Sequence, residues 1–193
     1  MYRLHGDERD CELLHCRNAD PTIVYSPNNI FSIGSGRNNK HSTKLMAEIQ
    51  SGLCPNWFVG VPGDETGASA QRAVLARSER GREVEAVHAP SDRLTDVGLI
   101  LRGPHPQDRK AAKQVVVLAG PSSLGTAGAC EAASSAKFAA QLAQYLKVLP
   151  GSRGGMIADR SRPLWVKVKA LADERDLHLK SAELMDAGFC EPE

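Results

Sequence analysis

The sequence is short of aromatic residues and carries almost no net charge. Phe, Trp and Tyr make up 5% of its 193 residues, and 24 Lys and Arg stand against 23 Asp and Glu. Few aromatics argue against a platform on which single-stranded bases stack. General nucleic-acid binders usually carry a basic surplus, because counterion release from phosphates drives their affinity. We therefore expect no nucleic-acid partner.

Long apolar runs are also lacking. The longest, such as Val115–Ala119, fall far short of the roughly 20 residues that a membrane-spanning helix needs. The N-terminal residues, MYRLHGDERDCELLHC, do not include the apolar stretch of a secretory signal. These absences predict a cytoplasmic protein without a membrane partner.

The cysteines do not form the even, regularly spaced set of a disulfide framework. They number five and are spread over the chain: Cys11, Cys16, Cys54, Cys130 and Cys190. Free thiols in a reducing compartment are the simpler interpretation. Residue types that bind zinc occur together near the N-terminus, at His5, Cys11, His15 and Cys16. Their spacing matches no standard zinc finger, so we expect neither a metal nor another cofactor.

Apolar runs of strand length alternate with segments of helical spacing. An expected strand over 30–33 precedes a helix in which Leu45, Met46 and Ile49 recur at helical spacing. The other expected helices are 68–78, 126–133 and 138–149. The other expected strands are 57–61, 83–89, 96–102, 114–119, 164–171 and 177–184.

The order of these elements favours an α/β fold. The run Gln114–Ala119 does not alternate, which is typical of a central strand covered on both faces. We expect a mostly parallel, Rossmann-like sheet with helices on both faces, and an antiparallel C-terminal hairpin at its edge. The length fits a single α/β domain over 1–193, with 1–20 poorly ordered.

The strongest local signal for a site is the segment Val115–Thr126, VVVLAGPSSLGT. Here a strand ends in a loop containing Gly120 and Gly125, and a helix begins. Backbone N–H groups at a helix N-terminus favour a phosphate or a carboxylate. Hydroxyl groups add further donors, from Ser122, Ser123 and Thr126. Two interpretations remain open: an anion cradle, or a tight strand–helix turn whose small residues serve packing.

The spacing of this loop resembles the P-loop pattern G-x-x-x-x-G-K-[ST]. Thr126 stands where that pattern has its lysine. No lysine of the loop therefore reaches the β- and γ-phosphates of a nucleoside triphosphate. We do not expect hydrolysis by the P-loop route.

A second loop follows the expected strand 30–33 in the same strand–loop–helix setting. It consists of Gly34, Ser35, Gly36, Arg37 and Asn38. Arg37 would pair with a negative group, and Asn38 would hold a hydroxyl or an amide. In a parallel sheet, ligands bind beyond the carboxyl ends of the strands. We therefore expect this loop to share one edge with Gly120–Thr126.

A third candidate, Arg102 to Pro106, also follows an expected strand. His105 lies there between two prolines on a rigid turn. It would act as an acid, a base or a hydrogen-bond donor beside Arg102, or it is an ordinary surface histidine.

Three segments in order carry a resemblance to a known family. They are Ser32-Ile33-Gly34-Ser35 with Asn38, Asp96-x-Gly98-Leu99-Ile100-x-Arg102 with Pro104-x-Pro106, and Gly120-x-x-x-x-Gly125-Thr126. Over 29–185, with 54–95 poorly matched, the chain resembles a family of small bacterial and archaeal Rossmann-like α/β domains without a settled function. The resemblance implies a fold similar to those that handle nucleotides or nucleosides. It implies no catalytic residue, and His105 replaces the asparagine usual in that turn.

Three functions remain open. The first is a domain that binds a nucleotide or another small phosphorylated or anionic ligand, in a sensing or regulatory role. The second is a protein-interaction module on a degenerate nucleotide-binding fold, including a homo-oligomer. The third is an N-glycosidic-bond hydrolase or transferase, which needs a facing pair of carboxylates. The candidates for that pair are Asp64, Glu65, Asp96 and Glu131.

Overall fold

The computed structural model describes residues 29–35, 39–60, 74–88, 94–108, 113–148 and 161–193. Within these residues the chain forms ten strands and three helices. No helix among them has both the length and the apolar character needed to cross a membrane.

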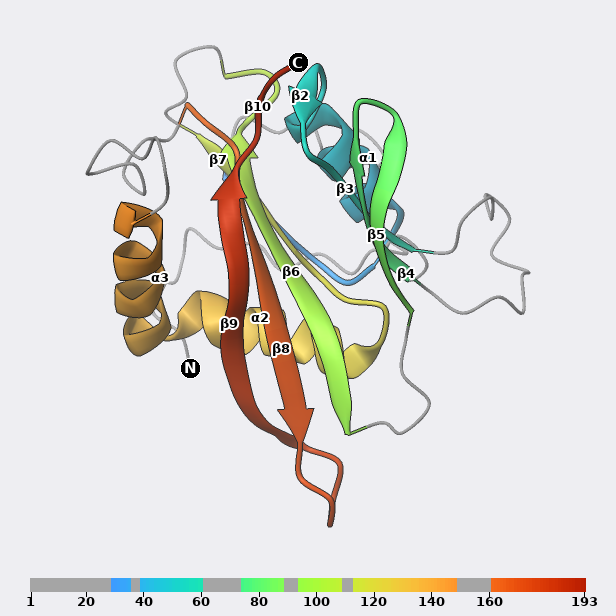
Figure 1. Cartoon of the computed structure of the whole chain (residues 1–193), viewed down its shortest axis with the longest axis vertical. Coiled ribbons are helices and arrows are strands. Elements are labelled where there is room, and N and C mark those ends of the chain that lie inside the picture. The colour runs from blue at the N-terminus through green and yellow to red at the C-terminus, as the bar shows by residue number, and fades with distance from the viewer. Residues whose placement is uncertain (1–28, 36–38, 61–73, 89–93, 109–112, 149–160) are drawn as a thin grey trace.

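A five-stranded sheet forms the centre of the molecule (Figure 1). Its order is β1-β7-β6-β8-β9. The strands are β1 (Ile30–Ile33), β7 (Gln114–Ala119), β6 (Thr95–Pro104), β8 (Leu164–Ala172) and β9 (Leu179–Phe189). Of its four pairings, β1 with β7 is parallel and the other three are antiparallel.

The expected Rossmann-like, mostly parallel α/β fold is therefore wrong. A parallel connection needs a crossover of about a dozen residues or more, usually a helix. Only residues 105–113 separate β6 from β7, and the two strands pair antiparallel. The unbroken apolar run of β7 indicates that both faces of the strand are buried. It does not indicate strand direction, because an antiparallel strand between two layers is buried in the same way. The nucleotide-handling role expected from that fold loses its basis as well.

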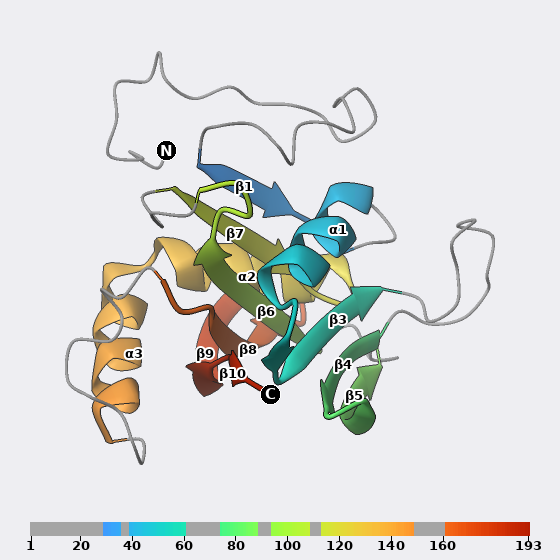
Figure 2. The same ribbon diagram turned by 90° about the horizontal axis from the view of Figure 1, so that it is seen from above.

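One face of the sheet is covered by α1 (Lys40–Ile49) and a small antiparallel sheet (Figure 2). The strands of this small sheet are β3 (Asn56–Gly60), β4 (Val74–Glu79) and β5 (Arg82–His88). Leu45, Met46 and Ile49 of α1 are buried in the core on this side. The two sheets meet at Trp57 and Trp165, whose ring centroids lie 5.0 Å apart.

The hairpin β4–β5 corrects the expected helix over 68–78. Residues 74–79 of that segment form β4, and 61–73 lie outside the described residues. Val74 and Leu75 are buried, and Arg77 contacts Glu85 of β5 across the hairpin at 3.9 Å. Glu85 also accepts a hydrogen bond of 2.5 Å from Lys167 of β8. Cross-strand contacts therefore outweigh the weak helical spacing.

The opposite face is covered by α2 (Ser123–Ser134) and α3 (Ala136–Val148). Phe138, Leu142 and Leu146 of α3 and small residues of α2 are buried in this core. Gly128 of α2 lies so close to the sheet that a Cβ there would be 2.5 Å from the Cβ of Ala170. Small residues in α2 thus allow the helix to approach β6 and β8 closely.

The predicted C-terminal hairpin is present as β8 and β9, with β9 at the sheet edge. Beyond β9, the two-residue strand β10 (Glu191–Pro192) pairs with β2 (Leu53–Cys54), which follows α1. This pair closes one end of the core beside the last turn of α1.

Candidate functional site

The structure brings two of the three predicted loops to one edge. Because β1 and β7 are parallel neighbours, Gly34 and Gly120 follow strand ends that lie side by side. The backbone N–H of Gly34 donates to the carbonyl of Leu118 at 2.8 Å. The chain then continues to α1 on one face and to α2 on the other (Figure 2). Ser35 is buried in the first loop. Gly36, Arg37 and Asn38 lie outside the described residues.

The N-terminus of α2 is occupied by a carboxylate of the protein itself. Oδ2 of Asp96 accepts hydrogen bonds from the backbone N–H groups of Ser122 at 3.0 Å and Gly125 at 3.1 Å, and from the Ser122 hydroxyl. Its Oδ1 accepts from the N–H of Val97 at 2.8 Å. Asp96 is 2% exposed. An internal anion therefore sits where the loop was expected to cradle an external one.

The remaining groups of this loop also have internal roles. The Ser122 hydroxyl caps α2 by accepting from the N–H of Leu124, and the Thr126 hydroxyl donates to the Ser122 carbonyl at 3.2 Å. Ser123 is exposed. A Cβ on Gly120 would lie 2.6 Å from the carbonyl carbon of Gly125, and one on Gly125 would lie 2.4 Å from the Val97 carbonyl oxygen. Close packing accounts for both glycines.

Arg102 and His105 lie at the other end of the sheet, because β6 runs antiparallel to β7. The structure therefore does not bring them together with the two glycine loops. His105 is 2% exposed, which differs from the surface histidine considered above. Its Nδ1 accepts from the backbone N–H of Gln107 at 3.1 Å, and its Nε2 has no partner among the described residues. Burial lowers the pKa of His105, and the nearby Asp108 partly opposes that shift.

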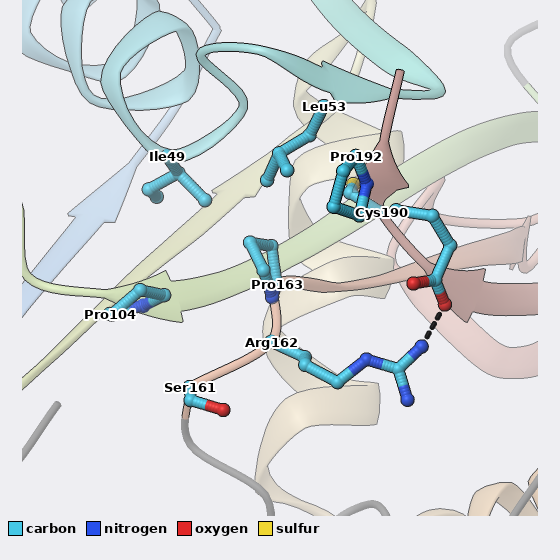
Figure 3. Close-up of a pocket in the computed structure, with 9 residues that line it drawn as sticks. Ile49, Leu53, Pro104, Ser161, Arg162, Pro163, Cys190 and Pro192 are labelled. Carbon is cyan, nitrogen blue, oxygen red and sulfur yellow. Dashed lines mark hydrogen bonds and ion pairs between the residues drawn. The ribbon is translucent and has the colours of Figure 1, made fainter.

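A cavity of about 380 Å³ lies at this same end, between α1, the end of β6 and β10 (Figure 3). Most of its wall is apolar. The residues that line it are Ile49, Leu53, Pro104, Ser161, Arg162, Pro163, Cys190, Glu191 and Pro192. They come from segments far apart in the sequence, which the β2–β10 pairing and the β6–β8 pairing place together.

The charged part of the wall is one ion pair. The guanidinium of Arg162 donates to the carboxylate of Glu191, as Figure 3 shows. The same guanidinium lies over the Phe189 ring, 4.7 Å from its centroid. The side chains of Arg162 and Glu191 are 30% and 57% exposed, so the pair borders solvent.

Cys190 supplies a buried thiol to the same wall. Its Sγ donates to the carbonyl of Pro55 at 3.4 Å. Burial, with a smaller effect of the Cys54 thiol, raises the pKa of Cys190 to about 12. The thiol therefore remains protonated at neutral pH and adds no charge to the cavity.

The sequence did not reveal this cavity. None of the candidate residues chosen from the sequence lines it, although His105 follows its lining residue Pro104. The available signals were Arg162-Pro163 before one expected strand and Glu191-Pro192 after the last one. Such dipeptides occur at many strand ends and do not indicate a binding site by themselves.

Metal and paired-carboxylate sites receive no support from the described residues. No group of three or more His, Cys, Asp or Glu side chains among them is placed to hold a metal ion. Asp64 and Glu65, like the N-terminal His and Cys residues, lie outside the described part. Asp96 is held by α2, and Glu131 is exposed on that helix.

Comparison of the chain with protein-family models, curated proteins and solved structures found no match.

Proposed function

We propose that this chain is a small-molecule-binding domain whose ligand is anionic and binds in the cavity between α1, β6 and β10. The observation that carries the proposal is a cavity of about 380 Å³ whose mostly apolar wall includes the Arg162–Glu191 ion pair at its border with solvent. Ligand pockets commonly measure roughly 300–1,000 Å³ and combine apolar walls with a few polar groups. Arg162 is the cation among the lining residues, and arginine stays charged at any physiological pH.

The two glycine loops support this function less well than the cavity does. The N–H groups at the start of α2 already bind Asp96, so a second anion would meet a buried negative charge there. Arg162, in contrast, holds a carboxylate that borders solvent. An anion in the cavity therefore competes for Arg162 with an exposed carboxylate, whereas at the start of α2 it would compete with a buried one.

A thermal-shift screen tests the proposal. The probes are sodium hexanoate, sodium benzoate, hexyl phosphate and inorganic phosphate. A ligand at ten times its Kd adds about 1.4 kcal/mol of stability and raises the Tm of a domain of this size by roughly 3–6 °C. We expect such a shift with at least one probe, and its loss in Arg162→Gln.

The matched control is Arg175→Gln, which removes an arginine from the exposed turn between β8 and β9. It should keep the full ligand shift. The proposal is overturned if none of the probes stabilises the folded protein, or if both variants respond alike.

A specific observation also favours a second function, that of a protein-interaction module. Phe31 and Ile33 project from the edge strand β1 and are 52% and 54% exposed. Strands at a sheet edge readily pair with another chain unless charges, prolines or bulges protect them. The segment IFSI has none of these residues. A second copy of the chain, pairing along β1, is the partner that we consider. The described residues offer no comparable support for the glycosidic-bond enzyme.

A further inference from the structure

We infer that the ligand is a small apolar molecule with one carboxylate group. In the free protein Glu191 occupies the binding position on Arg162, and the ligand's carboxylate replaces it on binding. This inference rests on the proposed function of the cavity and specifies both its ligand class and its control by the C-terminal strand.

The size and walls of the cavity define the body of the ligand. Ile49 and Leu53 form one side, and prolines form much of the rest (Figure 3). An engineered apolar cavity of about 150 Å³ admits benzene. A cavity of about 380 Å³ therefore suits a body of roughly a dozen non-hydrogen atoms or fewer. Such walls offer few partners to a sugar or another strongly polar body.

The position of Arg162 defines the head group. Its planar guanidinium fits a carboxylate with two parallel hydrogen bonds, and Glu191 shows that a carboxylate reaches it in this fold. The Phe189 ring lies against the guanidinium and limits its orientation. Phosphate sites in proteins usually add a helix N-terminus or further cations. Arg162 is the single cationic side chain among the described lining residues. No helix begins at any of these residues. One ligand carboxylate thus matches the single charge of Arg162 once it has replaced Glu191 there.

Exchange of Glu191 for a ligand carboxylate costs little. The Glu191 side chain is 57% exposed, and ion pairs at this exposure contribute little to stability because water solvates both partners. A ligand with the same head group gains, in addition, the burial of its apolar body. Glu191 belongs to β10, which holds β2 by two residue pairs, Glu191 with Cys54 and Pro192 with Leu53. Ligand binding should therefore loosen β10.

The experiment compares one alkyl chain with three head groups: sodium hexanoate, hexyl phosphate and 1-hexanol. Binding is measured by calorimetry on the full chain and on the variants Glu191→Gln and Arg162→Gln. Both substitutions lie at a solvent-bordering pair, and circular dichroism checks that each variant is folded. Glu183→Gln, at an exposed position of β9, is the matched control.

We expect Glu191→Gln to strengthen hexanoate binding about threefold to tenfold, because the internal competitor has lost its charge. The control should bind hexanoate as the original chain does, and Arg162→Gln should bind it at least tenfold more weakly. Affinity for 1-hexanol should be the same in all four proteins. Exchange of the Glu193 amide proton, which bonds to the Gly52 carbonyl beside β2, should become faster when hexanoate binds.

Failures of the two proposals give different results. Hexyl phosphate binding more tightly than hexanoate, with dependence on Arg162, overturns the carboxylate class and leaves the anion-binding function standing. Hexanoate binding that Glu191→Gln does not change overturns the exchange alone. Absence of binding by either anion in both the original chain and Glu191→Gln overturns this inference, and it overturns the proposed function as well when benzoate and inorganic phosphate also give no thermal shift. Binding of 1-hexanol alone has the same consequence, because the site is then a neutral one.

Discussion

The carboxylate of Asp96 accepts hydrogen bonds from both the backbone N–H and the hydroxyl of Ser122, the residue that caps α2. A strand residue thereby fixes the start of a helix that lies 26 positions later in the chain. The loop Gly120–Thr126, the strongest candidate site in the sequence, therefore links β6 to α2.

Asp96→Asn should lower the free energy of unfolding by about 3 kcal/mol. Whichever way the asparagine amide turns, its NH2 faces backbone N–H donors that the carboxylate satisfied, either that of Val97 or those of Ser122 and Gly125. Urea unfolding followed by circular dichroism measures the change. Glu131→Gln, at an exposed position of α2, should change stability by less than about 0.5 kcal/mol. A similarly small effect of Asp96→Asn would contradict the structural role.

The sequence predicted individual elements better than their arrangement. The strands β6, β7, β8 and β9 and all three helices lie close to their expected positions, because apolar spacing reports local burial. Strand direction depends on where each connection runs, and the polar segment between β6 and β7 carries no such signal. In the sequence Asp96 is one of several candidate carboxylates, and its contact with Ser122 exists only after β6 and β7 pair.

Gly98→Ala should be destabilising by about 3 kcal/mol. A Cβ on Gly98 would lie 2.3 Å from the Gly125 carbonyl oxygen and 3.1 Å from the Cβ of Ala129, so β6 and α2 would have to separate. Chemical denaturation again measures the change. Gly81→Ala is the comparison, since its Cβ meets no atom within 4 Å and only its backbone angle φ of +73° is unfavourable. That substitution should cost about 1 kcal/mol. Equal costs for the two would contradict the close packing.

The cavity illustrates what local patterns cannot indicate. Ile49 ends a helix, Pro104 ends a central strand, and Arg162 precedes another strand. Each residue is ordinary in its own segment, and the concave surface arises from pairings between β2 and β10 and between β6 and β8. A ligand site built from separated segments therefore requires the fold before it can be recognised.

Stability should fall as the pH drops below about 6.5, the ordinary pKa of histidine in an unfolded chain. Burial lowers the pKa of His105 in the folded state, so below this pH the unfolded chain binds the proton more readily. The contribution of neutral His105 is fully present above pH 6.5 and is lost as the pH falls toward its lowered folded pKa. Urea midpoints between pH 5 and pH 8 measure this dependence.

His105→Asn tests whether His105 causes this pH dependence. The asparagine oxygen can still accept a hydrogen bond from the Gln107 N–H, so the variant removes the titrating group and keeps that contact. This variant should show a smaller loss of stability on acidification. His178→Gln, an exposed histidine in the turn before β9, should behave as the original chain does. If His105→Asn keeps the full pH dependence, another group is responsible.

The exposed edge of β1 makes a prediction about association. No strand lies on the outer side of β1 in the part of the chain that the structure describes, and Phe31 and Ile33 leave apolar surface exposed on one face of this edge strand. The other sheet edge, β9, includes Lys180, Glu183 and Asp186 and pairs with register shifts, which discourage pairing with a further strand.

If β1 pairs with a second copy, light scattering coupled to gel filtration should detect a dimer at roughly 10–100 μM, where protein interfaces of modest size form. Ile33→Lys should return the chain to a monomer, because a charged side chain on an edge strand discourages pairing with another strand and two copies would bring like charges together. Met185→Lys, which places the same charge on β9 at a position 44% exposed, should leave the dimer intact. A monomer at every concentration would remove the interaction module from consideration and leave the cavity as the functional surface.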